Sequence, residues 1–309
     1  MNEQLFKQLT QAKQASRHMM TMNTQSKNQA LIKIAQALKD HVLEIINENQ
    51  KDIEHAKASG MSDAMVDRLL LNEDRIVAMA DDVLKLVSLD DPVGDIIREI
   101  KRPNGLLIKQ VRVPIGIFGI IYESRPNVTV DIACLCIKSG NVCVLKGGKE
   151  AIHSNRILTK LMREAIKETL PVDCVQLIDY GGREMVDELI HAYGYVDVVV
   201  PRGGAGLIQH VVQNATVPVI ETGAGNCHLY IDKEADLKKA IDITVNAKIQ
   251  RPSVCNAIET ILVHQDIADT YLPLLYEAFH ERVDIRGDSK VQKIIAMSVS
   301  YINRLCDRI

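Results

Sequence analysis

One cysteine stands in a setting suited to chemistry. Cys255 lies in the polar segment RPSVCNA, residues 251–257, whereas Cys134 and Cys136 lie in an apolar run typical of a protein core. The neighbouring Arg251 favours the thiolate, which is the nucleophilic form of cysteine. The segment predicts a nucleophilic thiol, and a structural or idle cysteine remains the alternative.

Three other loops carry cations or glycines directly after strand-like runs. Residues 123–127 read ESRPN, residues 146–149 read KGGK, and residues 201–204 read PRGG. Glycine lets a backbone approach a ligand closely, and the first turn of a helix can hold an anion on its free N–H groups. These loops are therefore candidate anion or cofactor sites. The alternative is that the glycines only form turns and the cations are solvated, since the same residues would then occur. The GxGxxG dinucleotide fingerprint is absent from the sequence.

Glu221 ends an apolar run and opens the segment ETGAG, residues 221–225. It is either a site carboxylate or the polar end of a strand, and its neighbours do not decide between the two. The nine histidines show no paired metal-ligand spacing. No metal site is predicted.

The N-terminal part of the chain is predicted to be helical and then to form a hairpin. Across residues 1–89 apolar side chains recur every three or four positions, as in the series Leu31, Ile34, Leu38, Val42 and Ile45. Strand-like runs at 94–100 and 106–113 flank the turn Pro103-Asn104-Gly105 and predict a hairpin. Such an arm near 94–113 suits contacts between subunits.

After Pro114, strand-like runs alternate with helical ones. Strands are expected at 116–122, 141–146, 196–200, 217–221, 228–232 and 259–263, with helices at about 127–138, from 150, at 237–247 and from 267. The alternation is typical of a doubly wound parallel sheet, so the fold class is α/β. Open parallel sheets bind ligands beyond the carboxyl ends of their strands, which is where the three loops lie.

Length and composition indicate a soluble, two-domain protein of a reducing compartment. The 309 residues are 47% hydrophobic and 25% charged, and the net charge of −3 favours neither a nucleic-acid partner nor a membrane surface. The N-terminus does not read as a charged-then-apolar leader, and no run of 18 apolar residues occurs. Seven cysteines without a CxxC pattern fit the cytoplasm.

Taken together, five segments resemble the gamma-glutamyl phosphate reductases, a family of the aldehyde dehydrogenase superfamily. They are YESRPNVT at 122–129, GNVCVLKGGKEAIHSN at 140–155, VPRGGAGLI at 200–208, ETGAGNCHLYID at 221–232 and QRPSVCNAIETILV at 250–263. Their order and number make the resemblance more specific than any single motif. It implies N-terminal helices and a Rossmann-variant cofactor domain at 1–219, followed by an α/β catalytic domain at 220–309.

The resemblance implies catalytic and substrate-binding roles for six residues. Cys255 would be the nucleophile, with its own backbone N–H and the Asn127 side chain as candidate oxyanion donors. Glu221 would be positional, because no water needs activation in the reductive direction. Substrate binding would fall to Arg125, Arg251 and Asn256.

The resemblance also implies how a cofactor is held. Lys146 would meet the adenosine ribose, with Gly147, Gly148, Gly203 and Gly204 as further cofactor-binding positions. Some NAD-preferring relatives place a glutamate three residues after that lysine, where this chain has Lys149. A cation there favours a 2′-phosphate, so NADP(H) is the expected cofactor.

The implied activity is NADPH-dependent reduction of L-glutamyl 5-phosphate to glutamate 5-semialdehyde through a cysteine thioester, in proline biosynthesis. A homo-oligomer and functional coupling with glutamate 5-kinase are expected, without nucleic-acid or membrane partners. Two alternatives stay open: a hydrolytic aldehyde dehydrogenase of another substrate, and an inactive truncated fragment. The second arises because family members continue further, and residues 291–309 do not resemble their continuation.

Overall fold

The computed structural model describes residues 2–221, 225–250, 252, 254–279, 282–295 and 298–299. The chain forms two compact units, Met1–Thr222 and Gly223–Ile309. The domain boundary expected from the sequence lies between residues 219 and 220, three residues before the division between the units. Cofactor binding by the first part and catalysis by the second remain predictions.

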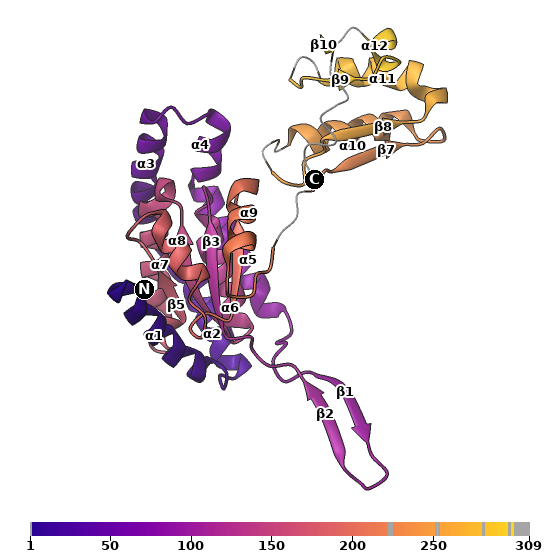
Figure 1. Ribbon diagram of the computed structural model, residues 1–309. Helices are drawn as coiled ribbons and strands as arrows, with labels where there is room; N and C mark the ends of the chain where they lie inside the picture. The colour runs from indigo at the N-terminus through magenta and orange to yellow at the C-terminus, as the bar shows by residue number, and fades with distance from the viewer. Residues whose placement is uncertain are drawn as a thin grey trace. The chain divides into compact units, whose positions relative to one another are not determined.

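The first unit begins with helices, as the apolar spacing predicts (Figure 1). Asparagine side chains cap three of them: Asn2, Asn23 and Asn72 each accept a hydrogen bond from an N–H of the following first turn. The five helices are α1 (Glu3–Met19), α2 (Thr24–Asp40), α3 (Val42–Ala58), α4 (Asp63–Leu69) and α5 (Glu73–Ser88).

A four-stranded parallel sheet forms the centre of the first unit, in the order β5-β4-β3-β6. Its strands are β3 (Ile117–Tyr122), β4 (Val142–Gly147), β5 (Val175–Leu177) and β6 (Val198–Arg202). The helical connections are α6 (Asn127–Lys138), η1 (Lys149–Ala151), α7 (Ile152–Ile166), η2 (Val172–Cys174) and α8 (Arg183–Ile190), and α9 (Ala205–Asn214) follows β6. The expected α/β class is confirmed.

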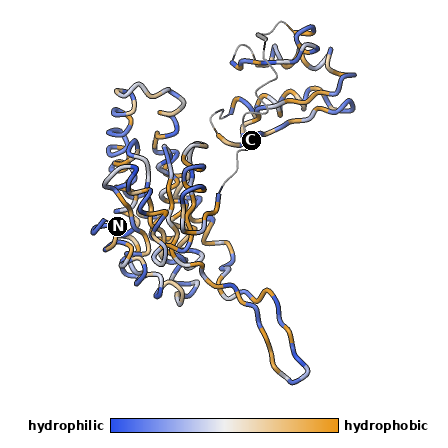
Figure 2. The backbone as a smooth tube through the Cα atoms, in the orientation of Figure 1, coloured by the Kyte–Doolittle hydropathy of each residue, from blue (hydrophilic) through white to orange (hydrophobic). Residues whose placement is uncertain are grey.

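Helices cover both faces of this sheet because the chain changes direction within it. The β3-α6-β4 and β4-α7-β5 connections run toward one edge, whereas β5-α8-β6 runs back past β3. Right-handed crossovers therefore place α6 and α7 on one face and α8 on the other. The strands of this sheet are rich in apolar residues, as the colouring of Figure 2 shows, and all six residues of β4 are buried.

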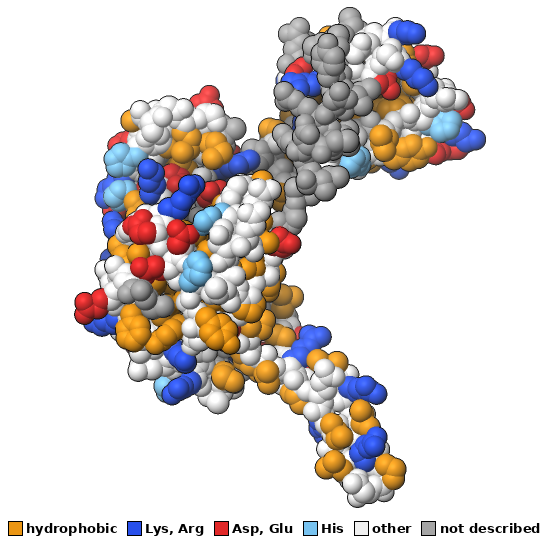
Figure 3. Space-filling model, viewed as in Figure 1, with side chains coloured by type: hydrophobic (Ala, Val, Ile, Leu, Met, Phe, Trp, Pro, Cys, Tyr) orange, Lys and Arg blue, Asp and Glu red, His pale blue; other side chains and the backbone are white. Residues whose placement is uncertain are grey.

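The predicted hairpin is present in the first unit. Strands β1 (Ile96–Lys101) and β2 (Leu107–Val111) pair in antiparallel fashion. Hydrophobic and basic side chains share its surface (Figure 3). The exposed apolar residues are Ile96, Ile97, Leu106, Leu107, Ile108 and Val111.

The second unit contains a short parallel pair, β7 (His228–Ile231) with β8 (Thr260–Val263). Helices α10 (Leu237–Ile249) and α11 (Gln265–Phe279) pack against each other, with Tyr271, Leu275 and Phe279 in the core. Short elements complete it: β9 (Arg286–Gly287), α12 (Val291–Ile294) and β10 (Ser298–Val299). Among the described helices of the chain, none is long and apolar enough to cross a membrane.

The expected strands differ from the structure at three points. β5 was not expected, and β7 and β8 pair with each other in the second unit instead of continuing the sheet of the first. A strand was predicted at 217–221, but there Val219 forms only an isolated bridge to Val199 of β6. The difference has a local cause, since Pro218 lacks the N–H that a strand needs on one side.

Replacing Ile34 with alanine should lower the free energy of unfolding of the first unit by about 2–5 kcal/mol, because its side chain is fully buried in α2 and a cavity would remain. Ile32→Ala is the matched control on the same helix, since Ile32 is 49% exposed. Its expected effect is within about 0.5 kcal/mol, apart from helix propensity. Urea unfolding of both variants checks the difference, and equal losses would contradict the assigned burial.

Candidate active site

The three candidate loops of the first unit lie at one edge of the sheet. Tyr122, at the end of β3, is in register with Gly147 of β4 and Arg202 of β6. The strands are parallel, so the loops that follow begin at the same level. The chain leaves β3 toward β4 and later returns to place β6 on the other side, which makes the β3–β6 boundary a topological switch point, the usual ligand crevice of such sheets.

The loop after β3 is hydrogen-bonded to both neighbouring loops. The Glu123 carboxylate accepts from the Gly204 N–H at 2.8 Å. The Glu150 carboxylate accepts from the backbone N–H of Ser124 at 2.7 Å and from its hydroxyl at 3.0 Å. Ser124 has φ of 46°, a conformation unusual for a residue other than glycine. The structure thus brings residues 123–127, 146–149 and 201–204 together, as the sequence predicts for an α/β sheet.

Lys146 ends β4 with its side chain largely buried. Its ammonium donates to the Tyr180 carbonyl at 3.3 Å. Burial lowers the pKa of this ammonium, while Glu184 and Asp179 act in the opposite direction. An ammonium has three N–H donors. Among the described residues, the Tyr180 carbonyl is the hydrogen-bond acceptor that the Lys146 ammonium reaches. Donors remain for a polar ligand such as a ribose.

A buried polar chain lies beneath the loop that follows Lys146. The Tyr122 hydroxyl is 2.6 Å from the Thr129 hydroxyl, which donates to the Asn155 amide oxygen at 2.8 Å. The Asn155 amide nitrogen is buried and has no partner among the described residues. A Cβ added to Gly147 would collide with that nitrogen. Gly147 thus leaves the space that the Asn155 amide occupies beneath this loop.

The other predicted cofactor glycines have a partner within the chain itself. A Cβ on Gly148 would collide with the Glu150 carboxylate, and one on Gly203 with the Glu123 carboxylate. These glycines were expected to allow close approach of a ligand, whereas the groups found against them are the two carboxylates. The sequence does place an acidic residue in or beside two of the candidate loops, since Glu123 belongs to ESRPN and Glu150 to KGGKE.

Asn127 begins α6 and is exposed. Its side-chain amide donates to the Asp131 carboxylate at 2.9 Å. Burial raises the pKa of Asp131 to about 6, whereas the Asn127 hydrogen bond acts to lower it and nearby Asp82 to raise it. Asp131 was not singled out from the sequence. Arg125, in the same loop, is half-buried.

A buried carboxylate fixes the helix that follows the Lys146 loop. Asp52 of α3 accepts from the Ser154 N–H at 2.8 Å and from the Ser154 hydroxyl at 2.6 Å, at the start of α7. Asn49 of α3 donates to the same hydroxyl at 3.0 Å. Unpaired N–H groups of a helix start are thereby satisfied by another helix, and α7 is held in place under residues 146–149.

In the second unit, Cys255 lies in an exposed turn before β8, with Asn256 exposed beside it. The Cys227 thiol donates to the Cys255 carbonyl at 3.4 Å. By contrast, burial raises the thiol pKa of Cys134 and of Cys174. A solvent-accessible thiol suits a nucleophile better than these buried ones.

The structure describes little of the surroundings of two predicted site residues, Arg251 and Glu221. Arg251 lies outside the described residues, as do residues 222–224 of the ETGAG segment. Glu221 is exposed at the end of the described part of the first unit. Its predicted positional role stays a prediction. No cluster of three or more His, Cys, Asp or Glu side chains suited to a metal ion occurs among the residues the structure describes.

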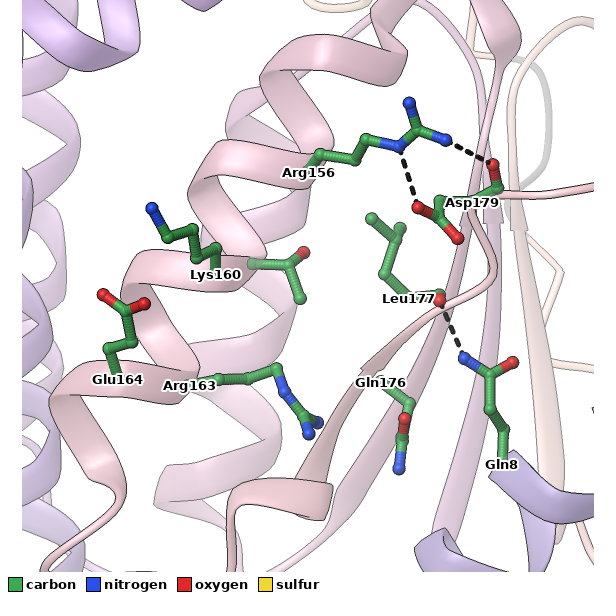
Figure 4. A pocket seen from close by; sticks show the side chains of 9 residues that line it. Gln8, Arg156, Lys160, Arg163, Glu164, Gln176, Leu177 and Asp179 are labelled. Atoms are coloured by element: carbon green, nitrogen blue, oxygen red, sulfur yellow. Dashed lines mark hydrogen bonds and ion pairs between the residues drawn. The ribbon is translucent and has the colours of Figure 1, made fainter.

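A separate surface cavity of about 420 Å³ lies beside the edge strand β5, between α7 and α1 (Figure 4). Most of its polar side chains are already bonded to other groups of the protein. The Arg156 guanidinium donates to the Asp179 carboxylate at 2.8 Å, and the Gln8 amide donates to the Leu177 carbonyl at 3.0 Å. This pairing leaves few donors for a ligand, so the three-loop edge remains the candidate site of the first unit.

Comparison with known sequences gives one consistent result. The protein-family model described as "Aldehyde dehydrogenase family" matches residues 2–293 of this chain. A gamma-glutamyl phosphate reductase of Clostridium botulinum (strain Eklund 17B / Type B) is 54% identical over 286 residues, which are 92% of this chain and 69% of that protein. One from Geobacillus sp. (strain WCH70) is 47% identical over 99% of this chain and 73% of its own length.

Solved structures agree. The crystal structure of gamma-glutamyl phosphate reductase from Thermotoga maritima matches with a TM-score of 0.87 and 43% identity, over 97% of this chain and 73% of that one. An acetylating aldehyde dehydrogenase from Geobacillus thermoglucosidasius matches with a TM-score of 0.70 at 19% identity, over 94% of this chain and 61% of that one. The second likeness concerns the fold alone.

The raised pKa of Asp131 predicts a pH effect on stability. Its folded pKa of about 6 exceeds the ordinary value of 3.8, so between these values the folded state binds more protons than the unfolded state. Stability should therefore fall as pH rises through this window, by at most about 1.4 kcal/mol per pH unit for one group. Asp131→Asn should flatten that dependence, as measured by urea unfolding from pH 4 to pH 7. An unchanged slope would exclude Asp131 as the titrating group.

Proposed function

This chain belongs to the aldehyde dehydrogenase family and, within it, to the gamma-glutamyl phosphate reductases, and we propose that it reduces L-glutamyl 5-phosphate to L-glutamate 5-semialdehyde and phosphate with NADPH, in proline biosynthesis. The observation that carries the proposal is the 54% identity over 92% of the chain to a reductase of that name. The exposed Cys255 and the three-loop edge are the parts of the chain that would perform the reaction.

Cys255 supplies the nucleophile. Its thiolate attacks the γ-carbonyl carbon of the acyl phosphate, a carbon–sulfur bond forms, and the carbon–oxygen bond to the leaving phosphate breaks. A reduced nicotinamide bound to the chain would supply the hydride for the thioester carbonyl carbon. The aldehyde is released as the carbon–sulfur bond breaks, which regenerates the Cys255 thiolate. The exposure of Cys255 supports this role, since an acyl phosphate must reach the sulfur.

The tetrahedral oxyanion needs donors that are already in place. We assign this role to the Cys255 backbone N–H and the Asn127 side chain, each contributing about 3 kcal/mol when correctly aligned. The Asn127 amide has two N–H donors, of which one is held by Asp131, so the other remains for a substrate. Glu221 is positional here, because phosphate departure requires no activated water.

Arginines suit the two anionic groups of the substrate. Arg125 and Arg251 are assigned to the phosphate and the α-carboxylate, since a guanidinium binds either group through two parallel hydrogen bonds. Asn256, exposed next to the nucleophile, is assigned to a polar group of the substrate.

The edge of the first unit is assigned to NADP(H). Family membership implies a nicotinamide cofactor, and the spare donors at Lys146 suit its ribose hydroxyls. Gly147, Gly148, Gly203 and Gly204 are assigned to the cofactor because they lie where β4 and β6 end at this edge. Lys149 is exposed at the start of η1, where a cation would attract the 2′-phosphate that distinguishes NADPH from NADH.

The exposed hairpin supports assembly with further copies of the chain. Ile97 is 55% exposed and Ile108 is 45% exposed on its two strands, and such apolar side chains gain free energy when an interface covers them. We therefore assign a homo-oligomer. Acyl phosphates hydrolyse readily, so functional coupling to glutamate 5-kinase, which forms this substrate, and a cytoplasmic location are part of the proposal.

The nucleophile is tested by oxidation of glutamate 5-semialdehyde with NADP, followed at the nicotinamide absorbance. Turnover should require inorganic phosphate, because phosphate must release the acyl group from sulfur. Cys255→Ala should lower kcat at least about 1,000-fold, since the bond-forming atom is lost. Cys227→Ala, which changes the other described cysteine of this unit that solvent can reach, should stay within about tenfold of the parent.

The same assay separates the alternatives. Turnover without phosphate would make the chain a hydrolytic aldehyde dehydrogenase. Activity of Cys255→Ala near that of the parent would remove the thioester route. If the 309-residue chain binds NADPH but gives no turnover, it is an inactive nucleotide-binding protein.

Cofactor preference is tested at Lys149. Lys149→Glu should lower the NADPH-to-NADH ratio of kcat/KM by about tenfold or more, because a carboxylate repels the 2′-phosphate. Lys160→Glu is the matched control, since Lys160 is an exposed cation of α7 and should leave the ratio unchanged. An unchanged ratio in Lys149→Glu would exclude Lys149 from 2′-phosphate recognition.

A further inference from the structure

The loop after β3 is the central one of the three-loop edge. Because β3 lies between β4 and β6, residues 123–127 have a neighbouring loop on each side. Glu123 and Ser124 are consecutive, yet their hydrogen bonds go to opposite neighbours. The Glu123 carboxylate bonds to Gly204 after β6, and Ser124 bonds to Glu150 after β4.

The Glu150 contact uses a single carboxylate oxygen. Oε1 accepts from both the backbone N–H and the hydroxyl of Ser124, which is 7% exposed. These bonds hold Ser124 in its left-handed backbone conformation, with φ of 46°. Gly148 leaves the space in which the carboxylate lies, since a Cβ there would collide with it.

The Glu123 contact joins the loop after β3 to its other neighbour. Its Oε2 accepts from the N–H of Gly204, the N-cap residue of α9. A Cβ on Gly203 would collide with this carboxylate. Glu150 therefore lies over a glycine of its own loop and bonds to a backbone N–H of the loop after β3. Glu123 reaches from the loop after β3 to both a glycine and a backbone N–H of the loop after β6.

We infer that Glu123 and Glu150 are positioning residues: their carboxylates lock the substrate-side loop 123–127 to the two cofactor-side loops, so that all three keep one arrangement when ligands bind. The functional half of this inference rests on the proposed assignment of these loops to NADPH and the acyl phosphate. The locking itself does not.

Negative side chains are unexpected at an edge assigned to phosphate groups, since like charges repel. Their hydrogen-bonded geometry offers the reason: both carboxylates are bonded to N–H groups and act as acceptors. A glutamine can keep such a bond through its side-chain oxygen while losing the charge. Alanine cannot, so glutamine and alanine variants separate hydrogen bonding from charge.

Locking is tested by amide hydrogen exchange followed by mass spectrometry on the full chain. Glu150→Ala should raise exchange at residues 123–127 by about tenfold, the effect of losing a hydrogen bond to a charged group. Glu150→Gln should remain near the parent, because one oxygen accepts both bonds. Glu164→Ala, on the adjoining helix α7, is the control and should change nothing there. Unchanged exchange in Glu150→Ala would overturn the inference.

The effect on the cofactor is tested by titrating each variant with NADPH and following its fluorescence. Glu123→Ala and Glu150→Ala should raise the dissociation constant by about tenfold, while Glu123→Gln and Glu150→Gln should stay within about twofold of the parent. Tighter binding by Glu123→Ala would show that the carboxylate competes with the cofactor for the Gly204 N–H, which overturns positioning. Equal loss in the glutamine and alanine variants would overturn it as well.

The two measurements keep the proposals distinct. If the parent chain does not bind NADPH while exchange responds as expected, the cofactor assignment fails and the locking of the loops stands. If NADPH binds and exchange does not respond to Glu150→Ala, the cofactor assignment stands and the inference fails.

Discussion

The parallel pairing of β3 with β4 on one side and β6 on the other is the constraint on which the candidate site depends. Strands that run in one direction end at one edge, so three loops far apart in the sequence meet there. The pairing is stable because the strands are apolar and helices cover both faces. A polar site can then be built from loops without disturbing the core that holds it.

The glycines of this edge show how two demands can fall on one position. A ligand that approaches a backbone requires the absence of a side chain, and so does a carboxylate lying against that backbone. Gly148 and Gly203 leave space for such carboxylates. A Cβ on Gly148 would collide with Glu150, and a Cβ on Gly203 would collide with Glu123. Glycine-rich loops in such folds therefore carry information about internal hydrogen bonds as well as about ligands.

The cysteines differ in how far their side chains are exposed to solvent, and this difference separates the packing cysteines from the candidate nucleophile. Cys134 and Cys174 are buried among apolar side chains, where burial opposes ionisation and raises the thiol pKa. Cys255 lies in an exposed turn whose neighbour Cys227 donates to its carbonyl. Cysteine is thus a core-packing residue in the first unit and a candidate nucleophile in the second. Membership of a reductase family agrees with this difference.

The sequence by itself determined the α/β class, the N-terminal helices, the hairpin and the family, because each rests on local periodicity or on the order of short segments. It also located the loops that carry Lys146 and Cys255. Only the tertiary structure showed that Glu123 bonds to Gly204 of the loop after β6 and that Glu150 bonds to Ser124 of the loop after β3. Those bonds join side chains to loops or turns that pairing and packing bring together, and neither periodicity nor a motif records which N–H a carboxylate will reach.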